Sequence, residues 1–203
     1  MELALLDPTA TLAQIEDICR KAADEKYEQL TVPPLFVKKA KELSAGSGIT
    51  VSAVIGYPFG WSAIEAKVAE TVLAMIDGAD ELEIVVNITA LKNNDWQYLA
   101  KEINMLLSIV RKQQKKICFT IETALLTDEE ITRCCDLYGA AGIDTINLGT
   151  GLQKELPSIE TVQSVRSQLA DMVAIKIMVP ATDKEILETY QAAGAGRPSL
   201  LVK

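Results

Sequence analysis

The sequence predicts a (β/α)8 barrel formed by a single domain spanning residues 1–203. Short apolar runs alternate with amphipathic helical patterns along the chain, which is typical of a parallel sheet covered by helices. No linker, low-complexity segment or block of charge divides the sequence. An open, doubly wound α/β sheet is the alternative, because the order of strands cannot be derived from one sequence.

Eight apolar runs are the expected strands, and amphipathic patterns between them are the expected helices. The strands span residues 3–6, 28–32, 49–55, 81–87, 117–122, 145–148, 172–177 and 198–202. The helices span residues 12–21, 35–44, 63–77, 95–112, 128–140, 159–169 and 183–193. This pattern predicts a short barrel that stops in its eighth strand, with the last helix missing. The outer face of that strand would be apolar and uncovered, so we expect a homodimer.

Four capping boxes support the positions of the helices. In this motif a Ser or Thr precedes the helix and a Glu or Gln follows three residues later, which satisfies two unpaired backbone donors. The pairs are Thr11 with Gln14, Ser62 with Glu65, Thr127 with Glu130, and Thr182 with Glu185. Each pair follows an expected strand and opens an expected helix.

Composition excludes several classes of function. The formal net charge of -8 disfavours nucleic acid as a partner. The chain has no histidine, which argues against a Ser-His-Asp hydrolase, a zinc-dependent aldolase and a metal site. Four cysteines without a CxxC spacing indicate buried thiols in a reducing compartment. Because neither a signal peptide nor a membrane span is visible, we expect a cytoplasmic protein that does not contact a membrane.

Three polar side chains should meet inside the barrel. Successive strand residues point to opposite faces, so Glu81 and Glu83 point inward if Leu82 and Ile84 pack under the helices. The same rule lets Glu83, Asn147 and Lys176 converge near the carboxyl ends of the strands, where barrel enzymes place their active sites. Lys176 is alternatively a structural lysine paired with Glu83, and Asn147 a structural hydrogen-bonding residue.

Several longer motifs occur along the chain: the Asp7-x-Thr9 pair, Ser52-Ala-Val-Ile-Gly-Tyr-Pro-Phe-Gly60, Asp77-Gly-Ala-Asp-Glu-Leu-Glu-Ile-Val-Val-Asn-Ile-Thr-Ala-Leu-Lys92, Ile121-Glu-Thr-Ala-Leu-Leu-Thr127 and Asn147-Leu-Gly-Thr-Gly151. These motifs resemble those of the deoxyribose-phosphate aldolases, which are class I aldolases that form a Schiff base. They cover essentially the whole chain in the order of the family. The resemblance implies a (β/α)8 barrel and the cleavage of 2-deoxyribose 5-phosphate to acetaldehyde and glyceraldehyde 3-phosphate, without a cofactor.

The same resemblance assigns candidate catalytic residues. Lys176 corresponds to the second lysine of the family's site, and Glu83 stands where the family has an aspartate. Asn147 occupies the position of the imine-forming lysine, and an amide nitrogen cannot form an imine. Asp7 is the remaining candidate.

The resemblance also implies candidate residues for the substrate and its phosphate, which lie at or after the ends of other strands. They are Thr9, Gly149, Thr150, Gly151 and Ser199. Val179 and Pro180 replace a glycine pair of the family, and proline has no N–H to donate to a phosphate. The expected partner is a small phosphorylated sugar or an aldehyde.

Three functions follow. The first is the family's aldol cleavage, weakened because Asn147 replaces the imine lysine. The second is a catalytically silent homologue that binds a metabolite or a protein. The third is an aldolase of altered substrate that uses Lys176 for the imine. The third function requires that burial keep part of the Lys176 amine uncharged, because no second lysine is present to lower its pKa.

Overall fold

Eight parallel strands close into a barrel in the computed structural model, which describes residues 1–182 and 184–202. Each strand pairs with the next along the chain, and β1 pairs with β8 to close the ring. The strands are β1 (Glu2–Leu5), β2 (Gln29–Val32), β3 (Thr50–Ile55), β4 (Glu81–Val85), β5 (Lys116–Thr120), β6 (Thr145–Asn147), β7 (Ala174–Pro180) and β8 (Arg197–Val202). The predicted (β/α)8 barrel is therefore confirmed, and the open sheet is excluded.

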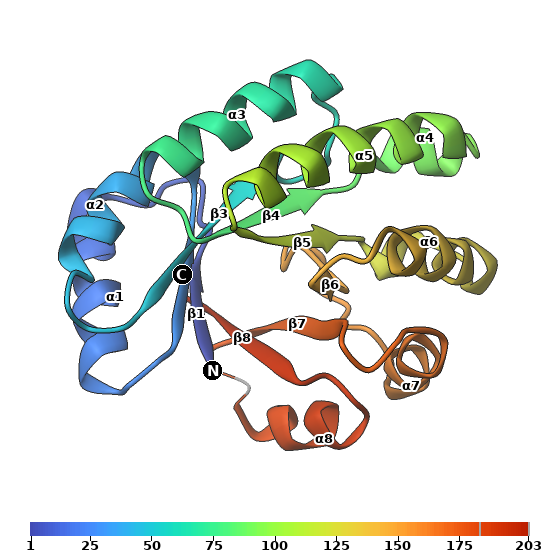
Figure 1. Ribbon diagram of the computed structural model, residues 1–203. Coiled ribbons are helices and arrows are strands. Elements are labelled where there is room, and N and C mark those ends of the chain that lie inside the picture. Colours follow the sequence, from blue (N-terminus) through green and yellow to red (C-terminus); the bar gives the residue numbers. More distant parts are fainter. Residues whose placement is uncertain (183, 203) are drawn as a thin grey trace.

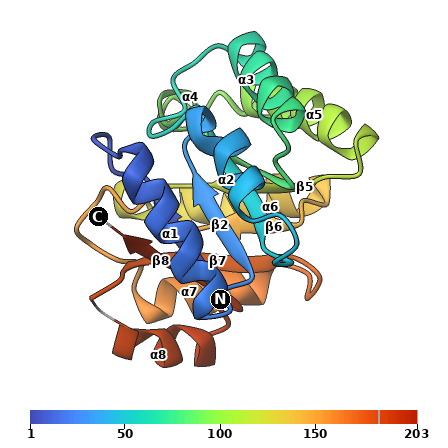
Figure 2. The ribbon, with the colours of Figure 1, turned by 90° about the vertical axis from the view of Figure 1, so that its left-hand side faces the viewer.

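Helices surround the strands in chain order, from α1 and α2 through α3 to α8 (Figure 1). They are α1 (Leu12–Asp24), α2 (Val37–Leu43), α3 (Ile64–Ile76), α4 (Ile88–Lys92), α5 (Trp96–Lys112), α6 (Asp128–Ala141), α7 (Ile159–Gln168) and α8 (Leu187–Ala192). Short 3-10 turns lie at η1 (Pro34–Phe36), η2 (Thr123–Leu125) and η3 (Lys184–Ile186). Figure 2 shows α1 and α2 in front of β2, with α3 and α8 at opposite sides of the barrel.

The short helix α4 was not predicted from the sequence. It begins directly after β4, where the side chain of Asn87 accepts a hydrogen bond from the backbone N–H of Ala90. The expected helix 183–193 begins at residue 183, which lies outside the described residues, and its regular α-helical part starts only at Leu187. None of the described helices is long and apolar enough to cross a membrane.

Two of the four capping boxes form as predicted. Thr11 opens α1 and Thr127 opens α6, each with reciprocal hydrogen bonds to the third helical residue. The prediction at Ser62 was wrong, because Ala63 is the N-cap of α3 and makes no side-chain capping bond. The fourth box, Thr182 with Glu185, flanks residue 183 and so spans a position outside the described residues.

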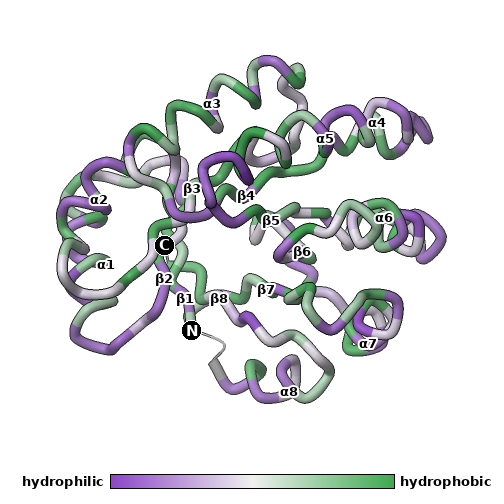
Figure 3. The backbone as a smooth tube through the Cα atoms, viewed as in Figure 1, coloured by the Kyte–Doolittle hydropathy of each residue, from purple (hydrophilic) through white to green (hydrophobic). Residues whose placement is uncertain are grey.

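The main core lies between the outer faces of the strands and the helices. Leu82 and Ile84 of β4 are fully buried there, as the alternation of the strand predicts. Along the backbone tube, most helices alternate between hydrophilic and hydrophobic colours, as amphipathic elements do (Figure 3). The outer face of β8 is less exposed than expected, because α8 packs on it and Leu200 belongs to the core.

Candidate functional site

The inside of the barrel holds a buried network of charged side chains. The Lys176 ammonium donates to the Glu83 carboxylate at 2.6 Å and also to Glu2. Glu83 accepts further hydrogen bonds from Asn147 Nδ2 at 2.7 Å and from Thr120 Oγ1 at 2.9 Å. Lys176, Glu83 and Asn147 thus converge, and all three are at most 1% exposed.

Below this network lies a second polar layer around Arg197. Its guanidinium donates to Glu81 at 2.9 Å, to Thr145 at 2.6 Å and to Gln29 at 2.8 Å. Arg197 and its three acceptors come from the alternate strands β2, β4, β6 and β8, as the side chains of one layer inside a barrel usually do. The layer faces a cavity of about 570 Å³ at the amino-terminal end of the barrel.

The neighbours of Lys176 hold its amine in the charged form. Burial alone lowers the pKa of Lys176, but the carboxylates of Glu2 and Glu83 outweigh burial and raise the pKa well above its usual value. Conversely, burial raises the pKa of Glu2, but Lys176 and Arg197 outweigh it and hold that pKa below its usual value. A nucleophilic amine requires the neutral form, which this arrangement disfavours.

An apolar layer closes the network toward the carboxyl ends of the strands. We call it the mouth plug, and it consists of Ala4, Leu6, Val54, Tyr57, Met178 and Leu201. Met178 and Leu201 lie one inward position beyond Lys176 and Ser199 on their strands. The three converging polar groups therefore lie deeper in the barrel than the predicted position at its mouth.

The expected phosphate loop is filled by other parts of the chain. The Glu122 carboxylate accepts hydrogen bonds from the backbone N–H of Thr150 at 3.0 Å and from its hydroxyl at 2.5 Å. Gly151 has a φ of +78°, and a Cβ on it would lie 2.9 Å from both Leu201 and Met178. Apolar side chains of the mouth plug thus occupy the space beside Gly151.

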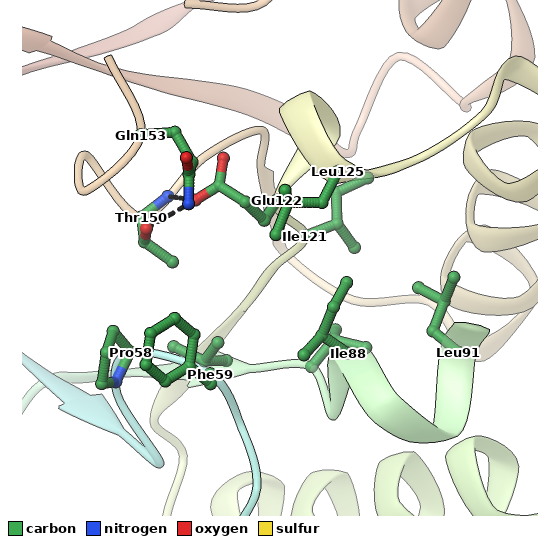
Figure 4. A pocket seen from close by; sticks show the side chains of 11 residues that line it. Pro58, Phe59, Ile88, Leu91, Ile121, Glu122, Leu125, Thr150 and Gln153 are labelled. Atoms are coloured by element: carbon green, nitrogen blue, oxygen red, sulfur yellow. Dashed lines mark hydrogen bonds between the residues drawn. The ribbon is translucent and has the colours of Figure 1, made fainter. Parts of the chain in front are cut away.

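A small cavity remains next to this loop (Figure 4). In Figure 4, Glu122 and Thr150 lie on one side of it, opposite Phe59 and Ile88. Its volume of about 20 Å³ accommodates roughly one water molecule. A sugar phosphate is far larger than this space.

The other predicted site residues have local partners. The Asp7 carboxylate accepts hydrogen bonds from the backbone N–H and the hydroxyl of Thr9, at 2.8 and 2.5 Å. The Ser199 hydroxyl donates to Glu2 inside the barrel at 3.1 Å. The backbone of Gly149 lies beside the Glu122 carboxylate. Among the residues that the structure describes, no group of three His, Cys, Asp or Glu side chains could hold a metal ion.

Glu2 and Arg197 were missed by the sequence analysis. Each stands one residue before the strand that the apolar pattern predicted, at 3–6 and 198–202. Extending those strands by one residue places both side chains on the inward face. A charged residue directly before an apolar strand was the available signal.

The closed (β/α)8 barrel and its inward-facing lysine fit the class I aldolases that the sequence motifs resemble. No family model matches the chain. The deoxyribose-phosphate aldolase of Brevibacillus brevis is 35% identical over 193 residues, which cover 95% of this chain and 86% of that protein. Deoxyribose-phosphate aldolase 1 of Cutibacterium acnes is 33% identical, with coverages of 95% and 88%. The chain belongs to the deoxyribose-phosphate aldolase family.

Solved structures agree with this assignment. The structure of QR15, an aldolase, matches with a TM-score of 0.90 at 28% identity, over 98% of this chain and 89% of that one. The tetrameric deoxyribose phosphate aldolase of Aeropyrum pernix shares the fold, with a TM-score of 0.88 at 21% identity, over 98% of this chain and 83% of that one.

Proposed function

We propose that this chain is a catalytically silent member of the deoxyribose-phosphate aldolase family, which acts by binding a metabolite or a protein. The observation that carries the proposal is the state of Lys176: its ammonium is completely buried and lies between two carboxylates. An imine requires a neutral amine that a carbonyl compound can reach. Asn147 offers no replacement, since its amide nitrogen is not nucleophilic.

The space around the site supports the same conclusion. The mouth plug lies over the network, and the cavity beside the Gly149–Gly151 loop holds about 20 Å³. A phosphorylated sugar therefore finds neither a route to Lys176 nor a free anion loop. The competing function, an altered-substrate aldolase that uses Lys176, needs an amine with a lowered pKa, whereas the pKa of Lys176 is raised.

Imine trapping tests the proposal. The protein is treated with acetaldehyde and borohydride, digested, and each lysine-containing peptide is analysed for a two-carbon adduct. Exposed lysines such as Lys38 act as internal positive controls, because simple amines react under these conditions. We expect no adduct at Lys176, and a stoichiometric adduct there would show that the barrel retains a reactive amine.

Two further properties belong to the proposal. Four buried free cysteines suit a reducing cytoplasm. We also propose a homodimer, in which a second copy covers the part of the outer face of β8 that α8 leaves half-buried, at Val202. Sedimentation velocity should show a species of twice the chain mass of 22.1 kDa, and a stable monomer would contradict the dimer alone.

A further inference from the structure

A second hollow lies on the carboxyl face of the barrel, outside the network of Lys176. It is an open groove of about 420 Å³ between the β3–α3 loop, α4 and the start of α5. Its lining residues are Trp61, Asn87, Thr89, Ala90, Asn93, Asp95 and Tyr98. Figure 1 shows α4 and α5 side by side at this part of the barrel, and the two helices are in contact.

An exposed aromatic ring forms one wall of this groove. Trp61 is 64% exposed, which is unusual for an indole. Phe59 stacks behind it, with ring centroids 4.6 Å apart and an interplanar angle of 27°. This stacking orients the indole without burying it, so one broad apolar surface stays available to a ligand.

Polar groups form the rest of the groove. Asp95 uses Oδ1 to cap α5 by accepting from the N–H of Tyr98 at 3.0 Å, and Asn93 uses Nδ2 to bond the carbonyl of Thr89 at 2.8 Å. Among the hydrogen bonds of the described residues, Oδ2 of Asp95, Oδ1 of Asn93 and the indole N–H of Trp61 have no partner. Asn87, only 9% exposed, and Tyr98 add an amide and a hydroxyl to the wall.

We propose that this groove binds a neutral sugar ring. The face of such a ring carries C–H groups that stack on an indole, and its edge carries hydroxyls that match amide and carboxylate groups. An apolar ligand would leave the polar wall unpaired. A phosphate would be repelled by the Asp95 carboxylate, which carries the only charge among the described lining residues. The net charge of -8 of the whole chain would add to this repulsion.

Saturation-transfer difference NMR tests the sugar site. The ligands are glucose, ribose and 2-deoxyribose, with the open-chain polyol sorbitol and ribose 5-phosphate as comparison ligands. We expect saturable millimolar binding of at least one ring sugar. Binding of sorbitol and of the phosphate should be about tenfold weaker or undetectable.

Variants connect the signal to the groove. Trp61→Ala should abolish binding, whereas Trp96→Phe removes the other tryptophan of the chain and should leave binding unchanged. Asp95→Asn keeps the capping oxygen and should restore part of the affinity for ribose 5-phosphate. The proposal is overturned if the unaltered protein and Trp61→Ala bind a ring sugar equally well. It is also overturned if no ring sugar gives a saturable signal. The groove contains none of Lys176, Glu83 and Asn147, so this result is independent of imine trapping.

Discussion

Lys176 shows how the neighbours of one side chain determine its chemistry. Its ammonium is balanced by Glu2 and Glu83, and the adjacent Asn147 is neutral. A lysine at position 147 would place a second positive charge beside the same carboxylate and would lower the pKa of both amines by repulsion. With asparagine there, only the attraction by the two carboxylates remains, and the role that we propose for Lys176 is that of a structural ion.

Removing this ion should destabilise the fold strongly. Lys176→Met leaves Glu2 and Glu83 buried without their shared cation, and losing one partner of a buried pair costs about 3–5 kcal/mol. Replacing Glu83 by glutamine in the same chain should recover about 1–3 kcal/mol, because one of the unpaired charges disappears. Urea denaturation of the two single variants and the double variant measures both effects.

The Glu83→Gln change suits this cycle because it keeps the acceptor oxygen for Thr120 and Asn147. If the free energies of unfolding lost in the two single variants simply add in the double variant, Lys176 and Glu83 are not coupled. Our description of the network would then be incorrect.

At the scale of the elements, the helix starts show that only some capping-box sequences form the capping hydrogen bonds. The Thr127 hydroxyl accepts a hydrogen bond from the N–H of Glu130 at the start of α6, and the Glu130 carboxylate accepts one from the N–H of Thr127. Ser62 has the same spacing to Glu65 but lies one residue before the N-cap of α3. The motif alone does not determine which residue becomes the cap.

These two positions make a matched pair of variants. Thr127→Ala should lower the free energy of unfolding by about 1 kcal/mol, because the first turn of α6 loses its cap. Ser62→Ala should change it by less than about 0.5 kcal/mol, as is usual for an exposed surface position. Chemical denaturation measures the free energy of unfolding of both variants. An equal decrease in the two variants would mean that Ser62 caps α3 in solution.

Periodicity predicted the elements and the inward faces of the strands, because both depend on local alternation. It did not predict α4, since five residues are too short for a helical pattern, nor the inward positions of Glu2 and Arg197 at the strand boundaries. It also could not predict the mouth plug. Leu6, Val54 and Leu201 are ordinary apolar strand residues until barrel closure brings them together.

At the scale of the whole molecule, the barrel is sealed at the end where relatives of this fold perform chemistry. The mouth plug lies over the ionic network, and the larger cavity of about 570 Å³ lies at the opposite end. The hydroxyl of Tyr57 donates to the carbonyl of Thr150 at 3.2 Å and joins two loops across the mouth. Under the proposed silent function, two separate features would prevent aldol cleavage: the absence of a lysine at position 147 and the apolar layer over the network.

Two substitutions should both be needed to recover aldol cleavage. Asn147→Lys supplies the missing amine, and Leu201→Ser removes the side chain that packs against Gly151 at the mouth. We expect neither single variant to release acetaldehyde from 2-deoxyribose 5-phosphate, and the double variant to do so at a low rate. The measurement is a coupled acetaldehyde assay on protein from a host that lacks its own aldolase. Activity of Asn147→Lys alone would show that the mouth plug opens readily in solution, and activity of the unaltered protein would contradict the silent function itself.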